Sequence, residues 1–310
     1  MRLDKRPRLG YNRRMQAYYL NSFDSTPLFV HEWPCESPKG LVIIHHDLGT
    51  HSGRLTSLCE PLAEGGYAVV AYDARAFGAT ARPEALGQAE KNNFALSRED
   101  LRFVCRYFQR KYAAATFLMG QGYGAYMVLS CLQHGLSGVR GVLLASAGLP
   151  DRHMLKLMRA SALPDNSAPD GVQKGRQRAL SLRAGTSGTD GYLTGDMERL
   201  ESYRNDPLCG VVPTAYFLRD MWANMVELTH HGGMGRLPRT VQYAVFCGMD
   251  DPMLGEGAED ATRLLEALRR LKPEKVRFFG YEGAKHALEE EGVRARYGEH
   301  ILHFLDAATE

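Results

Sequence analysis

A turn that could carry a nucleophile lies near the middle of the chain. Gly120-Gln121-Gly122-Tyr123-Gly124 has the outline of a nucleophile elbow, the strand-to-helix turn Gly-x-Ser-x-Gly that exposes a serine hydroxyl above a parallel sheet. Gly122 stands where the serine is needed, and no Gly-x-Ser-x-Gly occurs elsewhere in the 310 residues. Gly122 has no side chain, so no acyl-enzyme can form at that position. The turn therefore predicts the scaffold of acyl transfer without its nucleophile.

A carboxylate and a histidine follow this turn in the order nucleophile, acid, base that such a scaffold requires. Asp251 lies in a loop after an apolar run ending at Cys247, at the sheet edge where ligands of open α/β sheets bind. We choose Asp251 as the orienting acid; Asp250 is the alternative, and a solvated surface turn is the third interpretation. His286 lies between the last predicted strand and the last predicted helix. This is where the base should be, although a lone loop histidine is more often a surface residue.

The loop His45-His46-Asp47-Leu48-Gly49 follows the first buried strand and can direct backbone N–H groups at an oxyanion. We expect Asp47 and Leu48 to line the pocket, together with Gln121 and Tyr123 from the turn. The paired histidines also suggest a metal site. However, adjacent residues of a strand point to opposite faces, and no third ligand has a suitable spacing. The sequence therefore predicts no metal and no other cofactor.

The elements around these motifs alternate between short apolar runs and helical patterns, which is typical of βαβ units and a parallel sheet. After an N-terminal hairpin at 16–31, the predicted strands cover residues 40–46, 67–72, 115–119, 139–145, 241–247 and 276–279. The predicted helices cover residues 55–63, 96–111, 126–132, 258–271 and 293–305. We therefore predict an α/β fold with a mostly parallel central sheet and helices on both faces.

The alternation is lost between residues 149 and 239, which we interpret as an inserted helical cap. The core then comprises residues 16–148 and 240–310, and residues 1–15 form a basic arm. The cap has apolar residues at helical spacing that suit either a lipid-like ligand or ordinary packing under a lid: Met154, Leu155, Leu157, Met158, Met221, Trp222, Met225 and Leu228.

Composition and charge limit the choice of partners. The net charge of +2 gives no general reason to expect nucleic acid. Positive charge is concentrated in the arm, at Arg2, Lys5, Arg6, Arg8, Arg13 and Arg14. We expect a solvated tail there, with weak attraction to an anionic membrane surface as the alternative. No long apolar run follows the arm, and the six cysteines lack paired spacing, so we expect neither signal peptide nor transmembrane helix, and a cytoplasmic location.

Four motifs in order resemble the monoacylglycerol lipase and lysophospholipase branch of the α/β-hydrolases, the serine aminopeptidase S33 type, over roughly residues 16–308. Residues 46–54 are similar to that family's His-Gly-x-Gly-x-His-Ser-x-Arg loop, and residues 72–78 resemble its Tyr-Asp-x-Arg-Gly-x-Gly turn. Residues 205–208 match its Asn-Asp-Pro-Leu signature, and residues 283–286 resemble the segment around its catalytic histidine. The resemblance implies an α/β-hydrolase fold and carboxylic-ester hydrolase chemistry.

The chain departs from this family's pattern around the expected pocket. The elbow's usual His-Ser-Met is Gln121-Gly122-Tyr123, and the glycine of the oxyanion loop is Asp47. The turn glycine is Ala76, and its histidine neighbours are Ala74 and Phe77. An engineered loss of the serine alone would not explain Asp47 or Gln121.

Three functional hypotheses follow. The first is a degenerate hydrolase that binds a small acyl-type or lipid-like ligand and turns it over slowly or not at all. The second is an active ester hydrolase of the lysophospholipase or monoacylglycerol lipase type that uses water or another nucleophile, or whose serine was removed by engineering. Tyr123 and Ser130 are the nearest hydroxyls in sequence, but both lie past the turn. The third is a structural or interaction protein, against which the presence of Asp251 and His286 argues.

Overall fold

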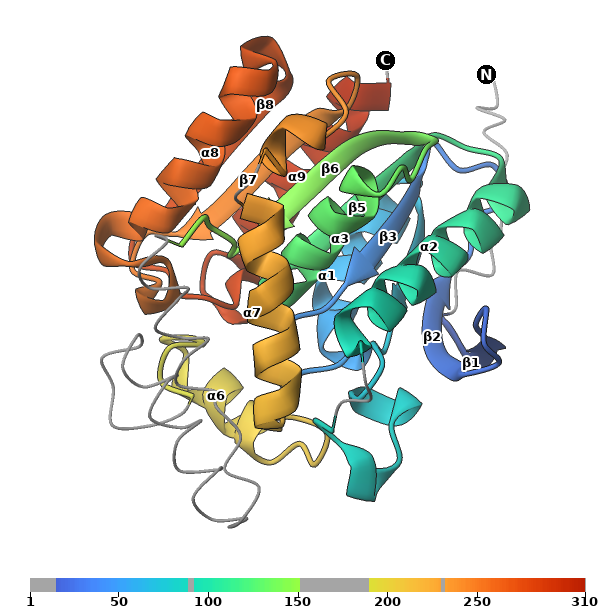
Figure 1. Cartoon of the computed structure of the whole chain (residues 1–310). Helices are drawn as coiled ribbons and strands as arrows, with labels where there is room; N and C mark the ends of the chain where they lie inside the picture. Colours follow the sequence, from blue (N-terminus) through green and yellow to red (C-terminus); the bar gives the residue numbers. More distant parts are fainter. Residues whose placement is uncertain (1–14, 89–91, 151–189, 230–231, 310) are drawn as a thin grey trace, which may run out of the picture.

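An eight-stranded sheet forms the centre of the computed structural model, which describes residues 15–88, 92–150, 190–229 and 232–309 (Figure 1). The strand order is β1-β2-β4-β3-β5-β6-β7-β8. The pairs β1–β2 and β2–β4 are antiparallel, and the other five pairs are parallel. The strands are β1 (Gln16–Asn21), β2 (Pro27–Trp33), β3 (Leu41–His45), β4 (Ala68–Tyr72), β5 (Thr116–Gln121), β6 (Val139–Ala145), β7 (Gln242–Gly248) and β8 (Val276–Tyr281). The predicted α/β fold class is thereby confirmed.

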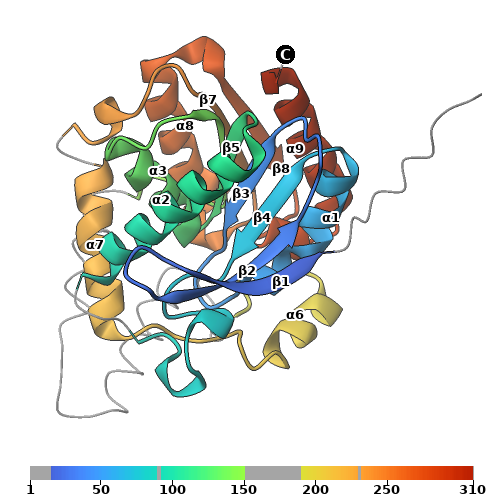
Figure 2. The same ribbon diagram turned by 90° about the vertical axis from the view of Figure 1, so that its right-hand side faces the viewer.

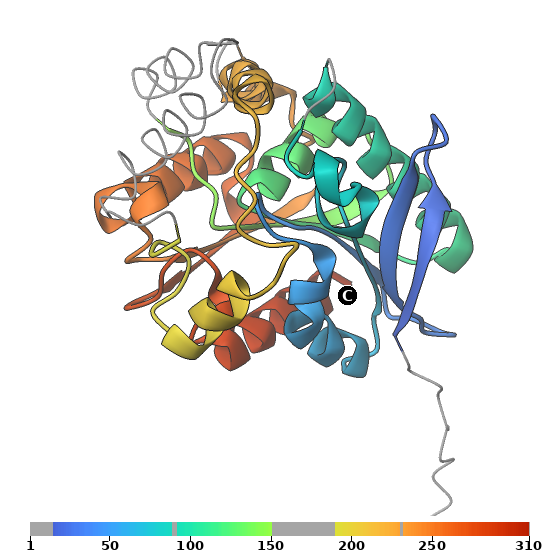
Figure 3. The same cartoon turned by 90° about the horizontal axis from the view of Figure 1, so that it is seen from below.

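Helices cover both faces of this sheet. In Figure 3, α2, α3 and α8 lie on one side and α1 and α9 on the other. Their bounds are α1 (Thr56–Glu64), α2 (Asn93–Tyr112), α3 (Tyr123–Gln133), α8 (Glu259–Leu271) and α9 (Arg294–Thr309). Alternate residues of one strand pack into two separate cores: Ile43 of β3 packs toward α2 and α3, and Ile44 packs toward α1 and α9. Because both faces are buried, the parallel strands have continuous apolar sequences, which is why they were predictable.

The N-terminal hairpin extends the sheet at one edge. β1 and β2 form the predicted antiparallel pair, and β2 continues to Trp33 to pair with β4 (Figure 2). Two predicted helices were placed too late: α2 begins at Asn93 and not at residue 96, and α3 begins at Tyr123 and not at residue 126. The chain passes from β5 into α3 through a single residue, Gly122, so no connecting loop separates the strand from the helix.

Between β6 and β7 the described residues include two further helices, α6 (Met197–Arg204) and α7 (Ala215–Thr229). Residues 151–189 lie outside the described residues, as does the basic arm up to residue 14. The cap at 149–239 therefore stays a prediction, and its apolar residues from Met154 to Met158 fall in the undescribed part. Those of α7 are buried: Met221, Trp222, Met225 and Leu228.

The turn that follows β4 is bonded to the loop after β3 and to α2 at the carboxyl edge of the sheet. The Asp73 carboxylate accepts hydrogen bonds from the backbone N–H groups of Ser52 and Ala79, each at 2.7 Å. A Cβ atom on Gly78 would lie 2.1 Å from Asp73 Oδ2, so this close approach requires glycine. The guanidinium of Arg75 donates to both carboxylate oxygens of Asp100 in α2, at 2.9 Å. These contacts fix the edge on which the site lies.

None of the described helices is both long enough and apolar enough to pass through a membrane. All six cysteines are free thiols, and four of them are buried.

Candidate active site

The turn at Gly122 has the backbone geometry of an elbow. Gly122 has a φ of 47° and a ψ of −112°, between the end of β5 and the start of α3. The neighbouring glycines are required by close approach: a Cβ atom on Gly120 would lie 2.3 Å from the carbonyl oxygen of Gly124, and one on Gly124 would lie 2.2 Å from that of His45. The turn is therefore tight enough to present residue 122 at the carboxyl edge of the sheet.

The carboxylate of Asp47 occupies the space beside Gly122 where a side chain would be. A Cβ atom on residue 122 would lie 2.1 Å from Asp47 Oδ1 and 2.3 Å from Asp47 Cγ. Asp47 Oδ1 accepts a hydrogen bond of 2.6 Å from the backbone N–H of Tyr123, the residue after the apex. In elbow-type hydrolases the N–H at this position stabilises the oxyanion. Asp47 thus fills the place of the missing nucleophile and takes one oxyanion donor.

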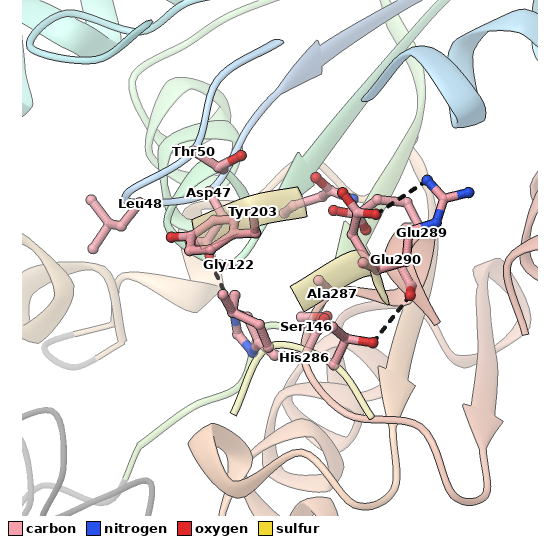
Figure 4. Close-up of a pocket in the computed structure, with 14 residues that line it drawn as sticks. Asp47, Leu48, Thr50, Gly122, Ser146, Tyr203, His286, Ala287, Glu289 and Glu290 are labelled. Atoms are coloured by element: carbon pink, nitrogen blue, oxygen red, sulfur yellow. Dashed lines mark hydrogen bonds and ion pairs between the residues drawn. The ribbon is translucent and has the colours of Figure 1, made fainter. Parts of the chain in front are cut away.

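His286 lies between two carboxylates. Its Nδ1 is 2.7 Å from Asp251 Oδ2. Its Nε2 is 2.9 Å from Asp47 Oδ2 (Figure 4). Burial alone would lower the pKa of His286, but the charges and hydrogen bonds of Asp251 and Asp47 raise it well above its ordinary value. The imidazole is therefore held protonated, with both N–H groups donating. In that state it cannot accept a proton from a nucleophile.

The electrostatics of Asp47 complement those of the imidazole. Burial would raise the pKa of Asp47, but His286 and the backbone N–H groups of Tyr123 and Leu48 lower it below its usual value. Asp47 is therefore an anion bound to a cation. Asp251 is 1% exposed and also accepts a hydrogen bond of 2.8 Å from the N–H of Met253, whereas Asp250, the alternative acid, is exposed.

The backbone of Asp47 is held by His46, one residue earlier. His46 Nε2 accepts a hydrogen bond of 2.9 Å from the backbone N–H of Ala74. Its Nδ1 therefore carries the proton and donates to the carbonyl oxygen of Asp47, at 2.6 Å. Burial lowers the pKa of His46, which favours this neutral form. Both ring nitrogens hold the loop, which leaves neither nitrogen of His46 for a metal ion.

A second group has metal-like spacing among the residues that the structure describes. One ligand atom each of His51, Asp206 and Cys209 lies within 4.8 Å of the others. However, His51 Nδ1 accepts the N–H of Gly53 at 3.2 Å, so Nε2 carries the proton that it donates to Asp206, at 2.9 Å. Burial raises the pKa of the Cys209 thiol to about 12. Metal ligands must give up these protons, so the three side chains are arranged as hydrogen-bond partners and not as free metal ligands.

Two cavities meet at the site. The larger has a volume of about 370 Å³, and its wall includes Tyr126, Leu218, Met221 and Trp222. The smaller has a volume of about 30 Å³, and its wall includes Gln121, Thr194 and Glu289 (Figure 4). Six residues line both cavities: Asp47, Leu48, Gly122, Ser146, Tyr203 and His286. Asp47 and His286 therefore line both the large cavity, whose wall includes apolar side chains, and the small one.

The other residues assigned to the pocket have different neighbours. Gln121 lines the small cavity, and its amide donates to the buried Glu289 carboxylate at 2.7 Å. Tyr123 contributes its N–H to the site, while its ring packs against Phe94 and Phe217. Leu48 lines both cavities.

Sequence reasoning missed Ser146, which ends up beside the base. It follows β6, has a φ of 51°, and lines both cavities. Its hydroxyl donates to the backbone carbonyl oxygen of His286, not to the imidazole. The only sequence signal for Ser146 was its place just after a strand, at the carboxyl edge of the sheet.

Comparisons with known proteins agree with this architecture. A family model described as serine aminopeptidase, S33, matches residues 36–292. A carboxyl esterase from Bacillus coagulans, solved with glycerol, has a TM-score of 0.80 at 18% identity, with 96% of this chain and 99% of that chain covered. A soluble variant of the Saccharomyces cerevisiae monoglyceride lipase, solved with a substrate analogue, has a TM-score of 0.74 at 16% identity, with 97% and 98% covered. At these identities the likeness shows the fold alone.

One curated relative also matches. The uncharacterized protein YnbC of Escherichia coli strain K12 is 26% identical over 224 residues, which is 71% of this chain. The chain spans about a third of that relative's length, at 36%.

The bond between Asp47 and His286 predicts a lower histidine pKa when the carboxylate is neutralised. In Asp47→Asn the cation loses one of its two anionic partners, so His286 should release its proton at lower pH than in the wild type. The ring resonances of His286 in an NMR pH titration measure this change. The exposed Asp250→Asn is the control, with no effect expected. An unchanged His286 pKa in Asp47→Asn would contradict the arrangement.

Glu289 predicts a pH dependence of stability. Burial raises the pKa of this carboxyl group from 4.5 to about 7. Its contribution to stability is therefore complete below pH 4.5 and is lost as the pH rises through about 7. Glu289→Gln removes this pH dependence. Its free energy of unfolding relative to the wild type should therefore be higher at pH 8 than at pH 4, by up to about 3 kcal/mol. The exposed Glu282→Gln is the control and should show no such difference. Urea unfolding at both pH values measures the difference, and equal effects at the two pH values would contradict the burial of a neutral Glu289.

Proposed function

Because the chain belongs to the serine aminopeptidase S33 family of α/β-hydrolases, we propose that it is a degenerate member. In this proposal it binds an acyl-type or lipid-like ligand in the larger cavity, with little or no serine-ester hydrolysis. The observation that carries the proposal is the Asp47 carboxylate, which fills the space above Gly122 and bonds both Tyr123 N–H and His286. One side chain thereby blocks the nucleophile position, the oxyanion donor and the base.

The chemical consequence of the missing nucleophile is large. Loss of the serine from a triad enzyme lowers kcat by a factor of about 10⁶, for which subtilisin is the reference case. That factor corresponds to a barrier higher by about 8 kcal/mol. Direct attack by water would need His286 as a base, but two carboxylates hold this imidazole protonated. Ester hydrolysis by the family's usual route is therefore not expected.

The charge of the site favours an uncharged ligand. Asp47 and Asp251 contribute two negative charges, and protonated His286 contributes one positive charge. These three side chains together therefore carry a net negative charge. A fatty-acid carboxylate would be repelled there, whereas a neutral acyl ester, amide or alcohol would not. The apolar wall, which includes Leu218, Met221 and Trp222, suits a hydrocarbon chain.

Alternative functions have less support from the geometry. The Asp47 carboxylate occupies the space that a serine side chain at residue 122 would need, so removal of a serine by engineering would also require Asp47 to turn into this position. A purely structural protein has no need of a 370 Å³ cavity above an intact acid and histidine pair. We further propose a cytoplasmic location, no nucleic-acid partner, and at most weak membrane contact through the basic arm.

The proposal predicts that no single substitution restores esterase activity. Gly122→Ser alone should stay silent, because its side chain would overlap the Asp47 carboxylate. The double variant Asp47→Gly with Gly122→Ser removes the overlap, frees Tyr123 N–H and leaves His286 with Asp251 alone, so it should hydrolyse p-nitrophenyl butyrate. Asp47→Gly alone is the matched control and should be inactive.

The wild type should also fail to react with a fluorophosphonate serine probe, while the double variant should be labelled. Stoichiometric labelling of the wild type would contradict the proposal.

Native mass spectrometry of the purified wild type tests whether the protein binds an acyl-type ligand. A co-purified neutral acyl lipid supports it, and a carboxylate ligand would contradict the charge argument.

A further inference from the structure

The Asp47 carboxylate is placed as a reactive group and not only as a plug. Its oxygens lie where the side chain of the apex residue would project, and Asp47 lines both cavities with 17% of its side chain exposed. Oδ1 is held by the N–H of Tyr123, which leaves Oδ2 beside the Nε2–H of His286. A carboxylate held by donors at one oxygen and by an acid at the other can act as a covalent nucleophile.

We propose that Asp47 is a nucleophile that opens an epoxide carried on an apolar, lipid-like chain, and that the chain's product is a vicinal diol. This goes beyond the proposed function but rests on it in one respect, the hydrocarbon chain in the larger cavity. The choice of electrophile follows from leaving groups. Attack of a carboxylate on an ester would form an anhydride and expel an alkoxide, a far worse leaving group than the carboxylate itself. Attack on an epoxide carbon relieves ring strain, and the ring oxygen can take a proton.

In the first step an electron pair of Asp47 Oδ2 forms a bond to an epoxide carbon. The C–O bond of the ring breaks, its electron pair goes to the ring oxygen, and this oxygen takes the Nε2 proton of His286. The result is a neutral hydroxyalkyl ester of Asp47 and a neutral imidazole. His286 lines the larger cavity, so its proton can reach a ring oxygen there.

The first step also prepares the second. Esterification removes the negative charge of Asp47, one of the two charges that keep His286 protonated. Asp251 still orients the ring through Nδ1. The neutral imidazole can then take a proton from water, and the water oxygen bonds to Asp47 Cγ. The charge develops on Oδ1, which the N–H of Tyr123 already contacts.

Collapse of this intermediate breaks the bond between Cγ and the alkyl oxygen. The departing oxygen takes one proton of the water molecule, and the other proton stays on His286. The carboxylate of Asp47 and the protonated imidazole are regenerated, and the net reaction is epoxide plus water to diol. One oxygen of the new carboxylate comes from water.

The smaller cavity can supply this water. Its volume of about 30 Å³ has room for about two water molecules, since each needs roughly 10–15 Å³ by this measure. Its lining includes Asp47 and His286, and the buried Gln121 amide adds a further polar group. The substrate chain and the water thus have two cavities available, and Asp47 lines both.

The experiment is a single turnover of the full-length wild type with epoxyoctane in water enriched in oxygen-18. We expect octanediol without the label, and one oxygen-18 atom in the proteolytic peptide that contains Asp47. Asp47→Asn should lower diol formation to the rate of the protein-free blank. Asp250→Asn, an exposed carboxylate outside the site, should retain the wild-type rate and the label on Asp47. Circular dichroism spectra of both variants establish that they are folded.

Three results would overturn the proposal: no diol above the blank with the wild type, diol made equally well by a folded Asp47→Asn, or labelled diol with no label on Asp47. Failure of this proposal can be distinguished from failure of the proposed function. Reaction of the wild type with the fluorophosphonate probe would refute a degenerate serine site and leave the epoxide result standing. Epoxide inertness together with a bound neutral lipid would refute only the nucleophile.

Discussion

The ion pair between Asp47 and His286 is the interaction on which the rest of this site depends. A buried carboxylate and a buried imidazolium each carry a large desolvation cost, which is offset only when hydrogen bonds satisfy both. Here Asp47 is satisfied by Tyr123 N–H and His286, and His286 is satisfied by Asp251. Removing His286 would leave the carboxylates of Asp47 and Asp251 without a cation, whereas removing Asp47 would leave His286 paired with Asp251 alone. The pair therefore determines which residues can stand at 122, how the base is protonated, and what ligand charge the cavity accepts.

The family's sheet supplies this arrangement with no change of topology. The turn after β5, the loop after β3 and the loops after β7 and β8 all open at the carboxyl edge, so residues 122, 47, 251 and 286 meet there. In a serine hydrolase the corresponding apex would project a hydroxyl toward the histidine. In this chain the apex is bare and the neighbouring loop projects a carboxylate into the same place. Gly122 and Asp47 are therefore two halves of a single change, since either one without the other would leave a clash or a gap.

The sequence was informative wherever a residue's role follows from burial or chain order. The strands β3 to β7 were recognisable because burial on both faces requires continuous apolar runs. The acid, base and apex were located because their order along this fold is fixed by the order of the strands. The family was indicated by four motifs in order along the chain, at residues 46–54, 72–78, 205–208 and 283–286.

The rest depended on contacts between segments that are distant in sequence. The backbone carbonyl of Asp47 is held by His46, whose ring also bonds to Ala74 after β4, and no local pattern encodes that bridge. Gln121 was expected only to line the pocket, and its buried partner Glu289 lies 168 residues away. Ser146 lies at the site because β6 ends beside the loop that carries His286. The start of α3 was misplaced because Gly124, a poor helix former, sits in its first turn.

The most direct test of this account is a crystal structure of the wild-type protein near neutral pH. The account predicts Asp47 Oδ1 within hydrogen-bonding distance of Tyr123 N and Oδ2 within hydrogen-bonding distance of His286 Nε2, with the carboxylate in the space that a side chain at residue 122 would need. An Asp47 side chain turned away from the elbow, with the imidazole facing solvent above a bare glycine, would contradict it.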